Sequence, residues 1–268
     1  MKLPIPCRAL LVDMDGVLWR GHTPIPENIE VLKEWSLPKV FLTNNSTKGR
    51  ARYRDRIRAL GIEVDLDHIL TSSYAAARWL QKRGYRQAFV VGGEGLVEEL
   101  EAQGIEVHTD PRWILEEGHR PEAVVVGTDH GLTYEKIWAA QRAITEGAIF
   151  VATNSDATYP VESGLAPGAG TILAAVQTAA GRAPHVIMGK PSPILFTQAL
   201  EILGVRPEEA LMIGDRWDTD IVGARKLGIP ALWVLTGITQ KVEQPPDDPH
   251  IYIARTLRDW VAQKRSSE

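Results

Sequence analysis

The chain has 268 residues, of which 44% are hydrophobic and 24% charged, and it carries a formal net charge of −4. This length allows two domains with a sizeable core, and the weakly acidic balance argues against nucleic acid or an anionic membrane surface as a partner. The single cysteine, Cys7, excludes an intrachain disulfide framework and a multi-cysteine metal site. No apolar run approaches the roughly 18 residues of a membrane-spanning helix, so we expect a soluble, cytoplasmic protein with no membrane partner.

The first predicted element is a short buried strand that ends in two carboxylates. Residues 9–12 are apolar, and Asp13, Met14, Asp15 and Gly16 follow them. An apolar run before a glycine turn predicts a strand that leads into a loop. Carboxylates at positions i and i+2 of an extended backbone point the same way and repel each other, unless a cation such as Mg²⁺ lies between them. A solvated turn is the alternative for this motif taken alone.

Strands and helices then alternate along the chain. Polar residues Thr43 and Asn44 end a second apolar strand at 39–42, and a helix capped by Ser46 or Thr47 is expected to run to Leu60. Further strands are predicted at 88–91, 105–108, 123–126, 148–152, 186–188, 210–213 and 230–235, the last of the chain. Helices are expected at 74–80, 95–103, 133–146, 171–180, 193–203, 219–227 and 256–263. This alternation predicts a parallel α/β sheet with right-handed crossovers.

Polar side chains gather at the ends of the predicted strands. In open α/β sheets, ligands bind outside the carboxyl ends of the strands, so residues placed there by several strands converge on one crevice. The set offers a carboxylate nucleophile, a second carboxylate for proton transfer, a hydroxyl and an ammonium for phosphate oxygens, and acids for a metal. Its members are Asp13, Asp15, Thr43, Asn44, Lys190, Asp215 and Asp220.

Taken in order, four motifs resemble those of the haloacid dehalogenase-like (HAD) phosphatase superfamily. They are Asp13-Met14-Asp15-Gly16-Val17, Leu42-Thr43-Asn44, Lys190-Pro191 and Gly214-Asp215-Arg216-Trp217-Asp218-Thr219-Asp220. Three more segments are similar to the branch that contains NagD, the 4-nitrophenyl phosphatases and the phosphoglycolate phosphatases: residues 41–47, 152–156 and 167–170. The interval between the first two motifs is too short for the helical cap that is typical of the phosphomutases.

The resemblance implies a Rossmann-like parallel-sheet core with an inserted α/β cap of the C2 type. The expected core comprises residues 1–79 and 186–268, and the expected cap comprises residues 80–185. Relatives with such caps often pair through them, so a homodimer is one possible assembly.

The resemblance also implies a phosphatase mechanism. Asp13 is expected to attack the phosphorus of a small-molecule phosphate monoester, and Asp15 to protonate the leaving alcohol and then activate water. Thr43, Asn44 and Lys190 are expected to hold the phosphate oxygens. The implied cofactor is Mg²⁺, held by Asp13, the backbone carbonyl of Asp15, and Asp215, with Asp220 as a ligand or as the partner of one.

Several assignments stay open at this stage. Asn154, Asp156, Tyr159 and Glu162 are candidate specificity residues, or they only stabilise the hinge of the cap. Asp218 is a further candidate in the last motif, for which a salt bridge or a role at the start of a helix is the alternative. Trp19 and Trp217 are candidates for the lining of the pocket. A non-catalytic phosphate-ester-binding scaffold of the same fold is the alternative function, and the sequence does not identify the substrate.

Overall fold

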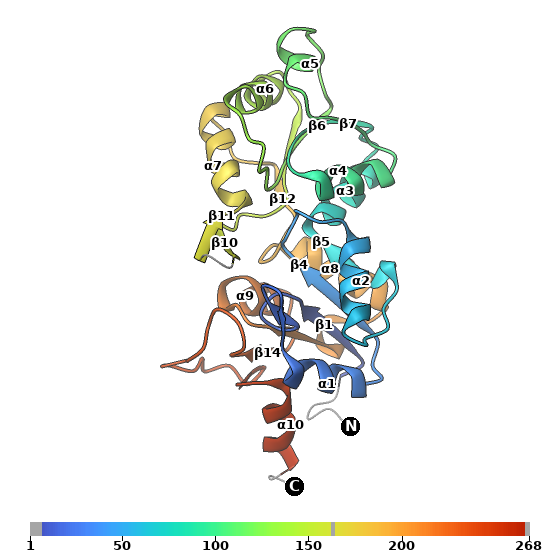
Figure 1. Ribbon diagram of the computed structural model, residues 1–268, viewed down its shortest axis with the longest axis vertical. Coiled ribbons are helices and arrows are strands. Elements are labelled where there is room, and N and C mark those ends of the chain that lie inside the picture. Colours follow the sequence, from blue (N-terminus) through green and yellow to red (C-terminus); the bar gives the residue numbers. More distant parts are fainter. Residues whose placement is uncertain (1–6, 162–163, 266–268) are drawn as a thin grey trace. The chain divides into compact units, whose positions relative to one another are not determined.

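The computed structural model describes residues 7–161 and 164–265, which form two compact units, each with a parallel sheet of its own (Figure 1). The first unit contains residues 1–43, 54–70 and 190–268, and the second contains residues 44–53 and 71–189. The predicted insert, residues 80–185, lies within the second unit, and its role as a cap stays a prediction. Among the helices that the structure describes, none is long and apolar enough to cross a membrane.

The sheet of the first unit has six strands, with β1 (Ala9–Asp13) inside it. In spatial order they are β15 (Ile251–Ala254), β14 (Ala231–Val234), β13 (Ala210–Gly214), β1, β4 (Lys39–Thr43) and β5 (Ile69–Thr71). The strands from β15 to β4 run parallel, with Leu11 opposite both Met212 and Val40. Because both faces of β1 and β13 are covered, these strands are continuously apolar and fully buried.

Helices cover both faces of this sheet (Figure 1). On one side, α1 (Pro26–Glu34) packs against α10 (Leu257–Arg265), and on the other α8 (Pro193–Leu203) packs against α9 (Val222–Lys226). As predicted, α8 begins with Pro193 after Ser192 and ends at the left-handed Gly204. The remaining elements are β2 (Trp19–Arg20), β3 (Thr23–Pro24), α2 (Arg50–Ala59), η1 (Leu66–His68), η2 (Pro207–Glu209) and the π-helical turn η3 (Trp217–Ile221).

The second unit repeats this architecture around a five-stranded parallel sheet. Its order is β12 (Val186–Ile187), β9 (Ile149–Ala152), β8 (Ala123–Val126), β6 (Gln87–Val91) and β7 (Glu106–His108). Helices α6 (Tyr134–Thr145) and α7 (Ala169–Ala180) lie side by side on one side of the sheet, and α3 (Ser72–Lys82) and α4 (Glu94–Ala102) on the other (Figure 1). A short helix, α5 (Arg112–Leu115), and the antiparallel hairpin β10 (Thr158–Val161) and β11 (Gly164–Pro167) complete it.

Some strand predictions are wrong, and each error has a physical reason. The strand at 230–235 is not the last, because β15 follows it as a partly exposed edge strand without a continuous apolar run. The hairpin of β10 and β11 was not predicted, because proline inside a run argues against a strand and β11 is largely exposed. β5 was not predicted, because it has only three residues and so offers no recognisable strand pattern.

Two helix starts also differ from the prediction. α2 begins at Arg50 instead of Ser46 or Thr47, because the backbone N–H and the hydroxyl of Thr47 both donate to Asn45 Oδ1 in a local turn. α7 begins at Ala169, after Gly168 at its N-cap, and not at Thr171.

Candidate active site

Three neighbouring strands of the first unit end in polar residues at the same edge of the sheet. β1 ends at Asp13, β4 ends at Thr43, and Asp215 follows the end of β13. All three side chains are buried. Parallel strands present their carboxyl ends together, which is why residues far apart in the sequence lie near one another here.

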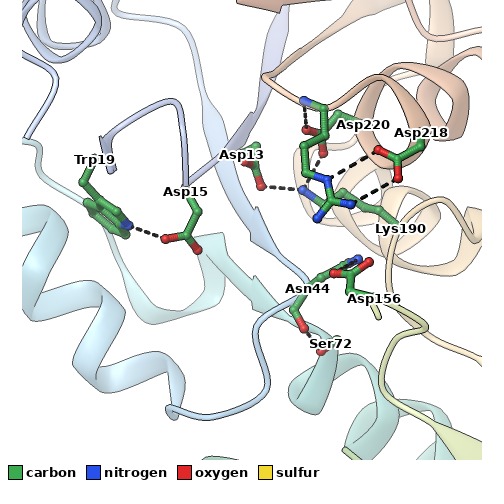
Figure 2. A network of polar contacts seen from close by, with 10 residues as sticks. Asp13, Asp15, Trp19, Asn44, Ser72, Asp156, Lys190, Asp218 and Asp220 are labelled. Atoms are coloured by element: carbon green, nitrogen blue, oxygen red, sulfur yellow. Dashed lines mark hydrogen bonds and ion pairs between the residues drawn. The ribbon is translucent and has the colours of Figure 1, made fainter. Parts of the chain in front are cut away.

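Lys190 lies between two of the predicted carboxylates. Its Nζ atom is 2.5 Å from Asp13 Oδ1 and 2.6 Å from Asp220 Oδ1, and all three side chains are buried (Figure 2). The contact with Asp13 is a hydrogen bond and an ion pair, and the contact with Asp220 is an ion pair. Burial lowers the pKa of Lys190, but Asp13 and Asp220 raise it by more, so its ammonium stays charged.

The pKa of Asp13 is raised well above its usual range. Burial is the largest cause, and the nearby carboxylates of Asp220 and Asp215 add to it, although Lys190 opposes them. A buried carboxylate with two other carboxylates close to it is stable as an anion only when positive charge lies nearby.

Asp215 and Asp220 come from one loop and the π-helical turn that follows it. Asp215 Oδ2 accepts a hydrogen bond of 2.8 Å from the backbone N–H of Ile238, and Asp220 Oδ2 accepts one of 3.1 Å from the backbone N–H of Arg216. Burial, followed by repulsion from Asp220, raises the pKa of Asp215 to about 7. No described residue gives a hydrogen bond to the buried Asp215 Oδ1.

The donor set fits a hard divalent cation. Asp13, Asp215 and Asp220 are all buried and offer carboxylate oxygens that lie within 4.8 Å of one another. Mg²⁺ and Ca²⁺ prefer oxygen ligands of this kind. Among the described residues Asp215 Oδ1 accepts no hydrogen bond, so its lone pairs are available to coordinate a metal ion.

Asp15 lies two residues beyond the end of β1, which ends at Asp13. Its side chain contacts a different partner from that of Asp13 (Figure 2). Its Oδ1 atom accepts a hydrogen bond of 2.8 Å from the indole Nε1 of Trp19. The group of three acids that could hold a metal does not include the Asp15 side chain, and the common direction of the Asp13 and Asp15 carboxylates stays a prediction.

Thr43 is the last residue of β4 and belongs to the first unit, whereas Asn44 is the first residue of the second unit. The Asn44 amide nitrogen donates to Asp156 Oδ2 at 3.1 Å (Figure 2). The Asn44 carbonyl accepts hydrogen bonds from Ser72 Oγ at 2.6 Å and from the Asn154 amide at 2.7 Å. Asn154 and Asp156 therefore fix the backbone and the side chain of Asn44 within the second unit.

The remaining candidates lie apart from the acidic group. Asp218 is mostly exposed and forms an ion pair with Arg216 at 3.1 Å, which was one alternative to a role in the site. Trp19 is fully buried, so it does not line an open pocket. Tyr159 contacts His130 through its hydroxyl, at 2.9 Å. Glu162 lies outside the described residues.

Two glycines surround Asp215: Gly16, which the sequence predicts only as a turn, and Gly237, to which the sequence gives no role. A Cβ atom on Gly237 would lie 1.7 Å from Asp215 Oδ2, and one on Gly16, whose φ is +85°, would lie 2.4 Å from Asp215 Cγ. Only glycine leaves room for the carboxylate at both positions. Gly237 follows the last predicted strand, but nothing in the local pattern indicates that it faces a residue from another loop.

Comparison with known proteins agrees with this geometry. The haloacid dehalogenase-like hydrolase family matches residues 10–106, and a HAD-hydrolase-like family matches residues 187–260. An acid sugar phosphatase of Staphylococcus saprophyticus is 33% identical over 259 residues, which cover 95% of this chain and 96% of the relative. The chain is a haloacid dehalogenase-like hydrolase.

Solved structures of phosphatases resemble the chain over nearly its full length. The p-nitrophenyl phosphatase from Archaeoglobus fulgidus has a TM-score of 0.86 and 35% identity, covering 97% of this chain and 100% of that one. The glycerol phosphate phosphatase from Mycobacterium tuberculosis in complex with magnesium has a TM-score of 0.82 and 33% identity, covering 96% and 77%. The same phosphatase has also been solved in complex with calcium.

This membership confirms the predicted fold class and the predicted class of enzyme. The chain is a NagD-like HAD phosphatase with a parallel-sheet α/β core, and it is a phosphoric monoester hydrolase.

Proposed function

We propose that this HAD phosphatase is Mg²⁺-dependent and hydrolyses small-molecule phosphate monoesters through an aspartyl-phosphate on Asp13. The observation that supports the proposal most is the buried group of Asp13, Asp215 and Asp220 around Lys190. The similar proteins are named for acid sugar, glycerol phosphate and p-nitrophenyl phosphatase activity. Small polar phosphate esters are therefore the substrate class that we expect.

The cation would be held by the side chains of Asp13, Asp215 and Asp220, together with the backbone carbonyl of Asp15 that the family resemblance implies. When bound, Mg²⁺ lets an anionic nucleophile approach an anionic phosphate and stabilises the negative charge of the transition state.

Each residue of the proposed site then has its own role in the reaction. One Asp13 oxygen forms a bond to phosphorus while the bond from phosphorus to the ester oxygen breaks, and Asp15 gives its proton to that departing oxygen. Asp15 next takes a proton from the water that hydrolyses the aspartyl-phosphate, which regenerates both carboxyl groups. Lys190 holds Asp13 in place and balances its charge, and the Thr43 hydroxyl and the Asn44 amide are proposed to bind phosphate oxygens.

The test compares the parent enzyme with Asp13→Asn on 4-nitrophenyl phosphate and glycerol phosphate, each with Mg²⁺ and with EDTA. We expect EDTA to abolish turnover and Asp13→Asn to lower kcat by on the order of 10³-fold or more, because the nucleophile is removed. Quenching the parent during turnover should leave phosphate on the peptide that contains Asp13, detectable by mass spectrometry.

A matched control is Asp218→Asn, which changes an exposed aspartate of the neighbouring loop and should retain most of the activity. Binding of the cation has its own readout, since Mg²⁺ should raise the Tm of the parent, and EDTA should reverse the rise. Turnover by Asp13→Asn at the parental rate would show that Asp13 is not the nucleophile.

A further inference from the structure

The loop that carries Asp15 is held in place through its backbone. Thr236 Oγ1 donates to the carbonyl of Gly16 at 2.6 Å, and the Asn28 amide donates to the carbonyl of Val17 at 2.9 Å. Asn28 and Thr236 are both buried. Asn28 also donates to Thr236 Oγ1 at 3.1 Å, so the two anchors support each other.

Trp19 closes the same loop a second time. Its backbone carbonyl accepts a hydrogen bond of 2.7 Å from the N–H of Gly16, and its indole Nε1 donates to Asp15 Oδ1 at 2.8 Å (Figure 2). The side chain is fully buried, so the indole has one orientation available to it. Its N–H is thereby aimed at one oxygen of the Asp15 carboxyl group.

Arg56 holds the other side of this arrangement. Its guanidinium lies over the indole ring of Trp19, 3.7 Å from the ring centroid, and it donates a hydrogen bond to the carbonyl of Gly21. A cation over an indole face is attractive, and the anchor on Gly21 fixes where the guanidinium sits. Asp15, Trp19 and Arg56 thus form a series of contacts that runs from the proposed acid to helix α2.

We propose that Trp19 is a positioning residue that orients Asp15 for proton transfer to the leaving group. This inference rests on the proposed function, in which Asp15 is the general acid. An aspartate side chain rotates about two bonds, and a general acid works only when its proton faces the departing oxygen. The hydrogen bond from Trp19 selects one rotamer before the substrate arrives.

The indole also bears on which oxygen of Asp15 carries the proton. An indole N–H only donates, and the carbonyl oxygen of a carboxyl group accepts a hydrogen bond better than its hydroxyl oxygen does. With Oδ1 as the acceptor, we place the transferable proton on Oδ2. As the bond from Asp13 to phosphorus forms and the ester bond breaks, this proton moves from Oδ2 to the leaving oxygen. Trp19 neither gains nor loses a proton, so it acts only through Asp15.

The test is Trp19→Phe, which removes the N–H donor and keeps an aromatic ring beneath Arg56. The readout is kcat/KM on glycerol phosphate, whose alkoxide is a poor leaving group, and on 4-nitrophenyl phosphate, whose phenolate is a good one. This parameter reports the step in which the leaving group departs. We expect a loss of roughly 10- to 100-fold on glycerol phosphate and less than about threefold on 4-nitrophenyl phosphate.

Three variants make the result specific. Trp35→Phe is the matched control, since Trp35 is equally buried and its Nε1 meets no hydrogen-bond partner within the described residues; it should change neither substrate's kcat/KM. Asp15→Asn should show a larger loss with the same dependence on the leaving group. Adding Trp19→Phe to Asp15→Asn should cause no further loss, because a residue that acts through Asp15 has nothing left to orient.

The outcomes separate this inference from the proposed function. If Asp15→Asn slows the two substrates equally, Asp15 is not the acid and the proposed mechanism fails. If the loss of kcat/KM caused by Asp15→Asn differs between the two leaving groups, but Trp19→Phe lowers kcat/KM equally on both substrates, only the positioning role fails. Should Trp19→Phe not fold, benzothienylalanine at position 19 replaces it, because that side chain keeps the bicyclic ring and lacks the N–H.

Discussion

Asp215 lies in a space that exists only because two neighbours lack side chains. Gly16 and Gly237 leave room for its carboxylate, and the backbone N–H of Ile238 is the donor to its Oδ2 atom. Burial and the nearby Asp220 raise its pKa to about 7. At neutral pH a proton and a cation therefore compete for the same oxygens.

This competition predicts how the affinity for Mg²⁺ depends on pH. Below a pH of about 7 the metal-free protein holds a proton on Asp215, which the cation must displace, so the affinity should fall from about pH 8 to about pH 6. The raised pKa of Asp13 acts in the same direction. Calorimetric titration in buffers with different ionisation enthalpies would also detect the released protons. An affinity that is constant over this range would contradict the prediction.

The same pKa shift has a defined sign for stability. Between the unfolded value of 3.8 and about 7, the folded metal-free chain holds a proton on Asp215 that the unfolded chain has lost. This contribution stabilises the folded chain fully below that interval and is lost as the pH rises through it. The stabilisation that Mg²⁺ confers should therefore be larger at about pH 8 than at about pH 6.

At this scale the sequence predicts the acidic group and little of what orients it. The ends of strands indicate that Asp13 and Asp215 lie together, because parallel strands end at one edge of a sheet. Lys190 follows β12, which belongs to the other sheet, so the strand pattern does not explain its place beside them. The hydrogen bond from Trp19 to Asp15 and the space at Gly237 are not visible as a repeating pattern in the sequence. Both arise from loops that come together only in the folded chain.

A buried ion pair joins α4 to the first residues of α2, which belong to the second unit. Glu99 Oε1 accepts a hydrogen bond of 2.6 Å from the backbone N–H of Arg50, and Glu99 Oε2 accepts one of 3.0 Å from Arg50 Nε. The Arg50 guanidinium also lies over the ring of Tyr74, 3.5 Å from its centroid. The Glu99 carboxylate thus pairs with the first backbone N–H group of α2 and with the buried guanidinium of Arg50.

Removing this carboxylate should destabilise the protein strongly. Glu99→Ala leaves the Arg50 guanidinium buried without its partner, so the free energy of unfolding should fall by about 3–5 kcal/mol. Urea denaturation measures the change. The control is Glu98→Ala, whose half-exposed side chain lies 3.9 Å from Arg52 and contributes no more than about 1 kcal/mol. Equal effects of the two substitutions would argue against the buried pair as the cause.

At the level of elements, strands inside a sheet are easier to predict than those at its edges. β1 and β13 are covered on both faces, so their residues form apolar runs that stand out in the sequence. β15 is partly exposed and β11 largely so, and both strands are held by hydrogen bonds to a neighbouring strand more than by burial of their side chains. Such strands are defined by backbone partners, which a single sequence does not display.

The whole molecule consists of two units with separate sheets and separate cores. The core of the second unit gathers Phe89, Val124 and Phe150 from three strands. The core of the first gathers Leu11, Phe41 and Met212, among others. Each unit therefore contains the apolar surface that a cooperative structure requires.

This organisation predicts a local response to Glu99→Ala. Hydrogen exchange followed by mass spectrometry should show faster exchange in β6 and β8 of the second unit, while peptides from β1 and β13 keep the protection of the parent. The Glu98→Ala variant should leave both sets unchanged. Equally faster exchange in all four strands would mean that the chain opens as a single cooperative structure.

The buried acidic group carries a net negative charge of its own. The chain carries a formal net charge of −4, and the acidic group, with three carboxylates and one ammonium, accounts for two of these negative charges when it is ionised. One divalent ion cancels them, whereas a monovalent ion of the same size leaves a residual negative field in front of an incoming phosphate dianion. The valence of the ion, as much as its radius, would thus decide whether an incoming phosphate dianion meets a neutral group or a negative one.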